Sequence, residues 1–271
     1  MYPAISVGGI IEIPLYGIMF LIGVVFAVFM GRRLGHEVDV SKEDVLYGTV
    51  YSLIGILIGA KFVYLLTRLP SLFSVLPAVK MGFEKNGLAT LFYLLNYLFG
   101  GYVYYGGLIG AMAGVYWYCR RYNIKFVSFM DIFAPLIPFV HGMGRIGCFF
   151  AGCCYGVEYH GFGSVQFPEN KLVPALDDVP RVPVQLMEAG LNFIFFGIMI
   201  YLFRKKEIRG GRLLGIYLLY YSAARFALEL LRGDKIRGNV GIFSTSQLIS
   251  VILIPAGIYL VTGKLAKEDK L

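Results

Sequence analysis

The chain has 271 residues, of which 58% are hydrophobic and only 15% are charged, and its mean hydropathy is +0.69. A soluble globule of this size needs more polar surface than such a composition supplies. The net charge of +8 could indicate nucleic-acid binding in a soluble protein, but in a membrane protein it is typical of basic cytoplasmic loops. We therefore expect a lipid bilayer as the environment and no nucleic-acid partner.

Apolar runs recur with short polar gaps, which predicts a single transmembrane domain over residues 1–271. A helix of about 20 residues crosses the hydrocarbon core of a bilayer. Runs of this length lie at residues 13–30, 45–66, 103–119, 129–149, 184–203, 213–231 and 243–262. The predicted fold class is an all-α polytopic membrane protein with about seven transmembrane helices.

Two of the apolar runs have features that the other runs lack. The first run has no positive charge before it and no small-residue cleavage site after it, so we expect it to remain as a helix and not to act as a signal peptide. The run Leu88–Gly100 is apolar but too short to span. It predicts an interfacial or re-entrant segment.

The basic residues between the runs predict the orientation. One set of gaps is denser in Lys and Arg than the other, and the denser set should be cytoplasmic, with the N-terminus outside and the C-terminus inside. The long polar segment 157–182 then forms a small extracytoplasmic head, with an irregular backbone favoured by its prolines. The cytoplasmic set consists of Arg32, Arg33, Lys42, Arg120, Arg121, Lys125, Arg204, Lys205, Lys206, Arg209, Arg212, Lys264, Lys267 and Lys270.

Ionisable residues inside the predicted spans are costly unless they are paired or face a watery cavity. They are Lys61, Arg145, Glu188, Arg225 and Glu229, with Asp131 near the end of a span. Arg225 and Glu229 are four residues apart on one helix face and can pair, and Arg232 lies one turn further on. The pair could belong to a functional cavity or be a structural ion pair.

Arg145 lies in a glycine-rich sequence with Gly142, Gly144 and Gly147. A guanidinium next to bare backbone suits a phosphate, because arginine binds phosphate oxygens in a bidentate fashion. The alternative is helix packing through the glycines with Arg145 extending towards the interface. Glu188, at the start of the next span, could cap a helix, pair with an arginine or act as a base.

Three of the four cysteines, Cys148, Cys153 and Cys154, cluster near His141. A zinc site is possible on ligand type, although adjacent cysteines rarely bind one tetrahedral ion. A disulfide and free structural thiols remain open as alternatives.

The run from Asp131 to Gly152 resembles the signature of the bacterial prolipoprotein diacylglyceryl transferases. The likeness extends along the chain in order. Further matching motifs are Leu15-Tyr16-Gly17, Gly59-Ala-Lys61, Tyr105-Gly-Gly-Leu-Ile-Gly110, Pro183-Val-Gln185-Leu-Met-Glu188, Arg225-Phe-Ala-Leu-Glu229-Leu-Leu-Arg232 and Ser246-Gln247.

The resemblance implies a reaction at the bacterial cytoplasmic membrane that uses no cofactor and no metal. A diacylglyceryl group moves from phosphatidylglycerol to the thiol of the lipobox cysteine that follows the signal peptide of a preprolipoprotein, and glycerol phosphate leaves. The expected catalytic residues are Arg145, Arg225, Tyr105, His141 and Glu229. The expected substrate-binding residues are Tyr16, Gly142, Gly144, Cys148, Cys153, Gly156, Gln185, Glu188 and Arg232.

The chain departs from the family pattern at several positions. Tyr105 stands where the family has a histidine, and a tyrosine is the weaker base at neutral pH. His141, one turn before Arg145, is the candidate to replace it. Cys148 and Cys153 stand where the family has asparagine and glutamate. The alternative function is therefore a divergent paralogue that keeps the phospholipid cavity but uses another acceptor, or a thiol redox or metal site.

Overall fold

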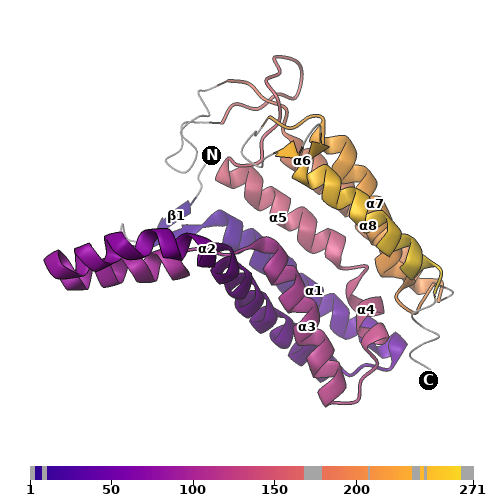
Figure 1. Cartoon of the computed structure of the whole chain (residues 1–271). Helices are drawn as coiled ribbons and strands as arrows, with labels where there is room; N and C mark the ends of the chain where they lie inside the picture. Colours follow the sequence, from indigo (N-terminus) through magenta and orange to yellow (C-terminus); the bar gives the residue numbers. More distant parts are fainter. Residues whose placement is uncertain are drawn as a thin grey trace. The chain divides into compact units, whose positions relative to one another are not determined.

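The computed structural model describes residues 4–7, 11–167, 179–206, 208–233, 239–240 and 243–263 (Figure 1). The chain divides into two compact units, each considered by itself. One unit contains Met1–Lys42 and Val127–Leu271, and the other is Glu43–Phe126. Helices dominate both units, as the sequence predicts.

The first unit begins with a short β-hairpin that the sequence does not predict. Strand β1 (Ala4–Val7) pairs antiparallel with β2 (Ile11–Pro14), with Ala4 opposite Pro14. The hairpin leads directly into α1 (Leu15–Leu34), and a short 3-10 helix, η1 (Gly35–Val38), follows. The predicted helix at 13–30 is therefore confirmed, but it starts two residues later because Pro14 belongs to the strand.

The predicted span at 129–149 is not a single straight helix. It contains two helices, α4 (Phe126–Phe133) and α5 (Ile137–Ala151), bent by 49° with respect to each other. Pro135 lies in the break and Pro138 in the first turn of α5. Proline has no N–H and its ring clashes with the preceding turn, so a straight helix cannot pass through this position.

Asp131 of α4 holds the connection between two later helices. Its carboxylate oxygens accept hydrogen bonds from the backbone N–H groups of Gly210, at 2.7 Å, and Gly211, at 2.9 Å. Both glycines have positive φ, which favours residues without a Cβ. The charge predicted near the end of a span is thus a structural anchor for a tight turn.

The remaining helices of this unit are α6 (Val184–Arg204), α7 (Arg212–Glu229) and α8 (Thr245–Val261). They agree with the predicted runs within two residues at either end. In chain order, α5 packs against α1 and α6, α6 against α7, and α7 against α8. A capping box between Ser244 and Gln247 starts α8, directly after the paired strands β3 (Asn239–Val240) and β4 (Phe243–Ser244).

The segment predicted as the head, 157–182, is described only at 157–167 and 179–182. Neither part contains a helix. Isolated bridges join Glu158 and Val165 to Arg181, and Tyr155 packs with Phe167 in a small apolar cluster. This irregular backbone agrees with its proline content.

The second unit consists of α2 (Lys42–Phe99) and α3 (Tyr104–Arg121). The helical run α2 turns back on itself, as two hydrogen bonds between distant residues show. The Tyr64 hydroxyl donates to the Tyr97 carbonyl over 3.2 Å, and Lys61 Nζ donates to the Gly101 carbonyl, also over 3.2 Å. Gly87–Leu98 is consequently a separate apolar stretch, shorter than a span. Its predicted interfacial or re-entrant location remains a prediction.

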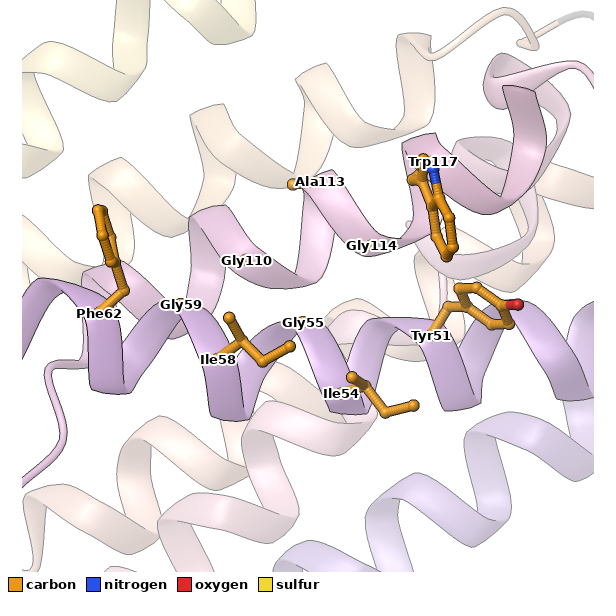
Figure 2. A pocket seen from close by; sticks show the side chains of 10 residues that line it. All are labelled: Tyr51, Ile54, Gly55, Ile58, Gly59, Phe62, Gly110, Ala113, Gly114 and Trp117. Carbon is orange, nitrogen blue, oxygen red and sulfur yellow. The ribbon is translucent and has the colours of Figure 1, made fainter. Parts of the chain in front are cut away.

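Helices α2 and α3 contact each other through glycines. A Cβ added at Gly55 or Gly110 would collide with backbone atoms of the other helix. The absence of side chains at these positions opens a shallow apolar groove between bulky residues (Figure 2). It is lined by Tyr51, Ile54, Gly55, Ile58, Gly59, Phe62, Gly110, Ala113, Gly114 and Trp117.

The structure supports a membrane-embedded protein. Within the described residues, Leu15–Val38, Lys42–Pro70 and Val184–Arg204 are long and apolar enough to cross a bilayer, and the bent pair α4 and α5 is a fourth candidate. Large apolar side chains such as Leu21, Val25 and Ile194 are exposed on the helix surfaces, as expected for contact with lipid.

Gly110→Ala should destabilise the protein, because the new methyl group meets the backbone of α2. Overpacking of this kind costs about 1–3 kcal/mol. The measurement is the midpoint of thermal unfolding in detergent. The matched control is Gly197→Ala on α6, where an added Cβ has no neighbour within 4 Å. Equal midpoints for the two variants would contradict the close approach of α2 and α3.

Candidate active site

A buried ion pair links α5 to α6. Arg145 Nη2 lies 2.9 Å from Glu188 Oε1, and the two side chains are only 11% and 3% exposed. Of the roles open to Glu188, the structure therefore shows pairing with an arginine. The alternative in which Arg145 extends outwards is wrong, because a buried charge in an apolar bundle is stabilised by its counter-ion and not by the interface.

His141 lies one turn before Arg145 and faces the same carboxylate. Its Nε2 is 3.4 Å from Glu188 Oε1, and its Nδ1 is 3.1 Å from the Tyr217 hydroxyl. An ionised carboxylate only accepts hydrogen bonds, so we assign Nε2 as the donor and Nδ1 as the acceptor from Tyr217. Tyr221 contacts the imidazole edge-on, with ring centroids 5.0 Å apart. The imidazole is thus held in one orientation from both sides.

Both side chains of the Arg145–Glu188 pair contain polar atoms that form no hydrogen bond to the described residues. Among the described residues, Arg145 Nε and Glu188 Oε2 are buried without a hydrogen-bond partner. Buried polar atoms are normally satisfied, and exceptions often mark functional sites. The site therefore offers an anion a free donor on the arginine, and it offers a proton a free acceptor on the glutamate.

A second charged cluster lies on α7 and its C-terminal extension. Arg225 forms an ion pair with Glu229, as the spacing of four predicts, and Arg225 Nη2 donates to Ser246 Oγ of α8 over 2.8 Å. Arg232 Nε is 3.8 Å from Glu229 Oε2. Arg225 is buried, and its Nη1 has no hydrogen-bond partner within the described part of the chain.

The two clusters interact electrostatically, since the Arg225 charge acts on both His141 and Glu188. Tyr217, Tyr221, Arg225 and Glu229 follow one another at intervals of four residues and so line one face of α7. The two tyrosines were missed in the sequence. Their spacing from Arg225 was the signal that could have identified them.

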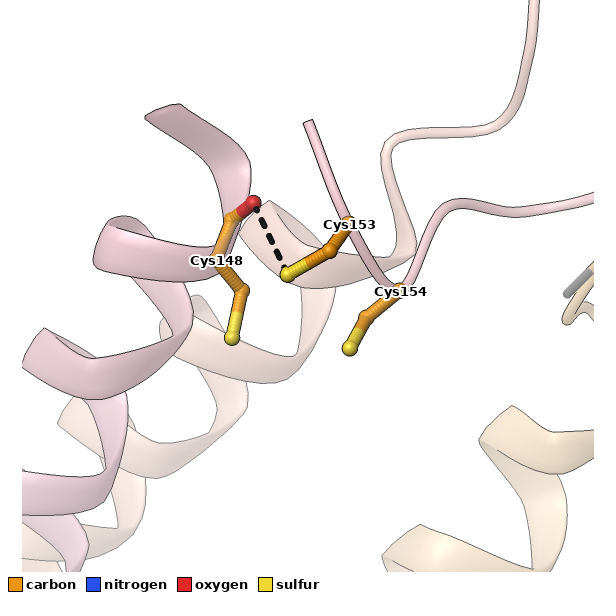
Figure 3. Close-up of side chains that lie close together, drawn as sticks. All are labelled: Cys148, Cys153 and Cys154. Atoms are coloured by element: carbon orange, nitrogen blue, oxygen red, sulfur yellow. Dashed lines mark hydrogen bonds between the residues drawn. The ribbon is translucent and has the colours of Figure 1, made fainter. Parts of the chain in front are cut away.

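The three clustered cysteines lie where α5 ends. Cys148 is in its last turn, Gly152 terminates it in a left-handed conformation, and Cys153 and Cys154 follow. Their sulfur atoms all lie within 4.8 Å of one another, and the three side chains lie side by side (Figure 3). No disulfide joins any of the four cysteines, all of which are described. Gln185 Nε2 donates to the Cys153 carbonyl over 2.8 Å.

The glycines expected to admit a headgroup behave differently from one another. A Cβ at Gly142 would lie 2.8 Å from Cε1 of Phe193, and one at Gly147 would lie 3.0 Å from Cα of Tyr16. These two positions serve helix packing. Only Gly144 has open space around it.

The other expected substrate-binding residues lie in different places. Gly156 forms a bridge with Arg232 and its N–H donates to the Val182 carbonyl, so it ties the loop to the end of α7. Tyr16 is 45% exposed on α1. Tyr105 belongs to α3 in the other unit, and its side chain is outside the described part of the structure.

Comparisons with known proteins agree with the motif resemblance. The family model described as "Prolipoprotein diacylglyceryl transferase" matches residues 3–262. The chain is 30% identical over 244 residues to the phosphatidylglycerol–prolipoprotein diacylglyceryl transferase of Clostridium tetani, covering 90% of each chain. It is 29% identical to transferase 2 of Clostridium perfringens, covering 92% of this chain and 90% of that one. The Serratia proteamaculans relative is 30% identical, covering 96% and 91%.

Glu188→Ala should strongly destabilise the fold, because it leaves the buried Arg145 charge without its counter-ion. Breaking one side of a buried pair costs about 3–5 kcal/mol. The measurement is the free energy of unfolding in detergent with a chemical denaturant.

The control for this variant is Glu158→Ala. Glu158 Oε1 contacts His160 Nε2 at 2.9 Å, but both side chains are more than half exposed, so the loss should be below about 1 kcal/mol. A similar small loss for Glu188→Ala would show that the Arg145 charge is compensated by another group.

Proposed function

The chain belongs to the prolipoprotein diacylglyceryl transferase family, and we propose that it transfers the diacylglyceryl group of phosphatidylglycerol to the lipobox cysteine thiol that follows the signal peptide of a preprolipoprotein. The observation that carries the proposal is the buried Arg145–Glu188 pair with its free arginine donor. It supplies what the reaction needs at one place: a cation for the phosphate and an acceptor for the thiol proton.

The two arginines bind the phosphate in this proposal. Arg145 Nε and Arg225 Nη1 are buried donors with no hydrogen-bond partner among the described residues. As the sulfur–carbon bond forms, the carbon–oxygen bond to the phosphate breaks and its electron pair leaves with glycerol phosphate. Guanidinium groups stabilise that developing negative charge through charge-assisted hydrogen bonds.

The thiol proton passes to the His141–Glu188 pair. Glu188 Oε2 is the open acceptor that takes the proton, and His141, held by Tyr217, keeps its Nε2–H directed at Oε1 of the same carboxylate and so orients it. A base that lies beside the departing phosphate can return the proton to it, so the enzyme ends the cycle unchanged. This arrangement makes up for the family histidine that Tyr105 replaces here.

The other matched residues hold substrates and the site in place. We assign Tyr105 to the phospholipid headgroup on the resemblance, and Glu229 to holding Arg225 in position. Gly144 leaves the open face beside Arg145. The remaining positioning residues are Tyr16, Gly142, Cys148, Cys153, Gly156, Gln185 and Arg232.

We also propose that the chain crosses the bacterial cytoplasmic membrane seven times as a single domain, with the N-terminus and the 157–182 head outside. The basic residues support this orientation. Arg32 and Arg33 lie in the last turn of α1, Arg120 and Arg121 in that of α3, and Arg204 in that of α6, so alternate helices would end on the cytoplasmic side. A reporter enzyme that works only in the cytoplasm should therefore be active when it is fused after residue 263, and one that works only outside the membrane should be inactive there.

Complementation tests the activity. A bacterial strain depleted of its own diacylglyceryl transferase should grow when it expresses this chain, and its prolipoprotein should carry the added lipid by mass spectrometry. Expression without lipidation would favour the alternative, a divergent paralogue that keeps the phospholipid cavity but uses another acceptor or a thiol redox or metal site.

Arg145→Lys should reduce the rate of transfer by about 10²–10³-fold, the usual effect of removing one donor that stabilises transition-state charge. A lysine keeps the charge and pairs with Glu188 but cannot make the forked contact with phosphate. The measurement is the rate of transfer from labelled phosphatidylglycerol to a lipobox peptide.

Arg209→Lys is the matched control for this variant. Arg209 lies in the loop between α6 and α7, and its Nη2 is 3.3 Å from Glu37 Oε2. Its substitution should leave the rate within about twofold, a barrier change of about 0.4 kcal/mol. Wild-type turnover in a folded Arg145→Lys protein would rule out Arg145 as the phosphate ligand.

A further inference from the structure

The three cysteines at the end of α5 are arranged as a set of ligands. Their sulfur atoms all lie within 4.8 Å of one another. Figure 3 shows Cys148 on the helix end beside Cys153 and Cys154 on the loop, with the Cys153 thiol donating to the Cys148 carbonyl over 3.7 Å. Thiolates that share a zinc ion at about 2.3 Å are about 3.8 Å apart in a tetrahedral site. Sulfurs that are already within 4.8 Å of one another are therefore within about 1 Å of the spacing that one zinc ion requires.

The backbone explains how two adjacent cysteines can face the same point. Neighbouring side chains in an extended segment point to opposite sides, which is why consecutive cysteines are poor partners for one metal. Cys154 has a φ of +63°, a left-handed conformation that is uncommon and costly for such a residue. With this conformation the sulfurs of the adjacent Cys153 and Cys154 both lie within 4.8 Å of the Cys148 sulfur.

The charges around the cluster suit a thiolate-bound dication. Three thiolates and one Zn²⁺ carry a net charge of −1, and the Arg145 guanidinium is within electrostatic range of both Cys148 and Cys154. All three cysteines are partly buried. Gln185, through its bond to the Cys153 carbonyl, fixes the loop that carries two of the ligands, as residues around metal ligands commonly do.

We propose that Cys148, Cys153 and Cys154 bind a single Zn²⁺ ion, with its fourth coordination position left for the thiol of the incoming peptide. Zinc sites with three protein ligands and one open position are the catalytic kind. Soft thiolate ligands select zinc over magnesium, calcium and manganese.

The role of the ion rests on the proposed function. A thiol that coordinates zinc loses its proton, which here passes to the His141–Glu188 pair. The zinc-bound sulfur then forms its bond to the glyceryl carbon while the carbon–oxygen bond to phosphate breaks, and the proton ends on glycerol phosphate. The metal thus occupies the place where the family has asparagine and glutamate, at the positions of Cys148 and Cys153.

The test is the metal content of the full-length protein purified in detergent without chelator. We expect about one zinc per chain by inductively coupled plasma mass spectrometry, and less than about a tenth of that in Cys148→Ser and Cys153→Ser. Cys119→Ser is the control, because Cys119 is a buried cysteine in the other unit. The Cys119→Ser protein should contain as much zinc as the wild type. Replacement by Co²⁺ should give sulfur-to-cobalt charge-transfer absorption in the wild type.

Three results would overturn the proposal: wild-type protein without zinc after zinc addition, zinc that persists in both serine variants, or bound copper in place of zinc. The wild-type measurement decides even if the variants fail to fold. Transfer activity is measured on the same samples. Active protein without zinc refutes the metal and leaves the transferase intact, whereas zinc-loaded protein that cannot transfer the lipid refutes the proposed function and leaves the metal site.

Discussion

The ion pair between Arg145 and Glu188 is the interaction on which the candidate site depends. An unpaired charge in the middle of an apolar bundle would cost several kcal/mol, so neither residue could be kept there alone. The pair fixes α5 against α6, and His141 extends the contact to α7 through Tyr217. One carboxylate thus connects α5 to α6, and through His141 to α7, while Arg145 Nε has no hydrogen-bond partner among the described residues.

Interactions within one helix could be predicted from the sequence, whereas interactions between helices could not. Arg225 and Glu229 were paired correctly because a spacing of four dictates their contact. The partner of Arg145 lies 43 positions away on another helix, and the sequence left three roles open for Glu188. The break at Pro135 was missed because the hydropathy of the run continues through it, although the proline itself was a sufficient signal.

The thiols illustrate how a local conformation changes the meaning of a sequence. Adjacent cysteines argue against a shared ion as long as the backbone is taken to be regular. The left-handed turn at Cys154 removes that objection, and no propensity rule predicts such a conformation for a cysteine. Similarly, the glycines around Arg145 are equivalent in the sequence. In the structure Phe193 packs against Gly142 and Tyr16 against Gly147, whereas Gly144 has no neighbour where a side chain would lie.

The hydrogen bonds of Asp131 also constrain the order of biogenesis. The residues whose backbone N–H groups donate to it, Gly210 and Gly211, are 79 and 80 residues further along the chain. At translation rates of about 5–20 residues per second, they leave the ribosome about 4–16 s after Asp131 does. Throughout that interval the carboxylate must stay hydrated or bound to the insertion machinery, so α4 can settle into its final place only after α6 has been inserted.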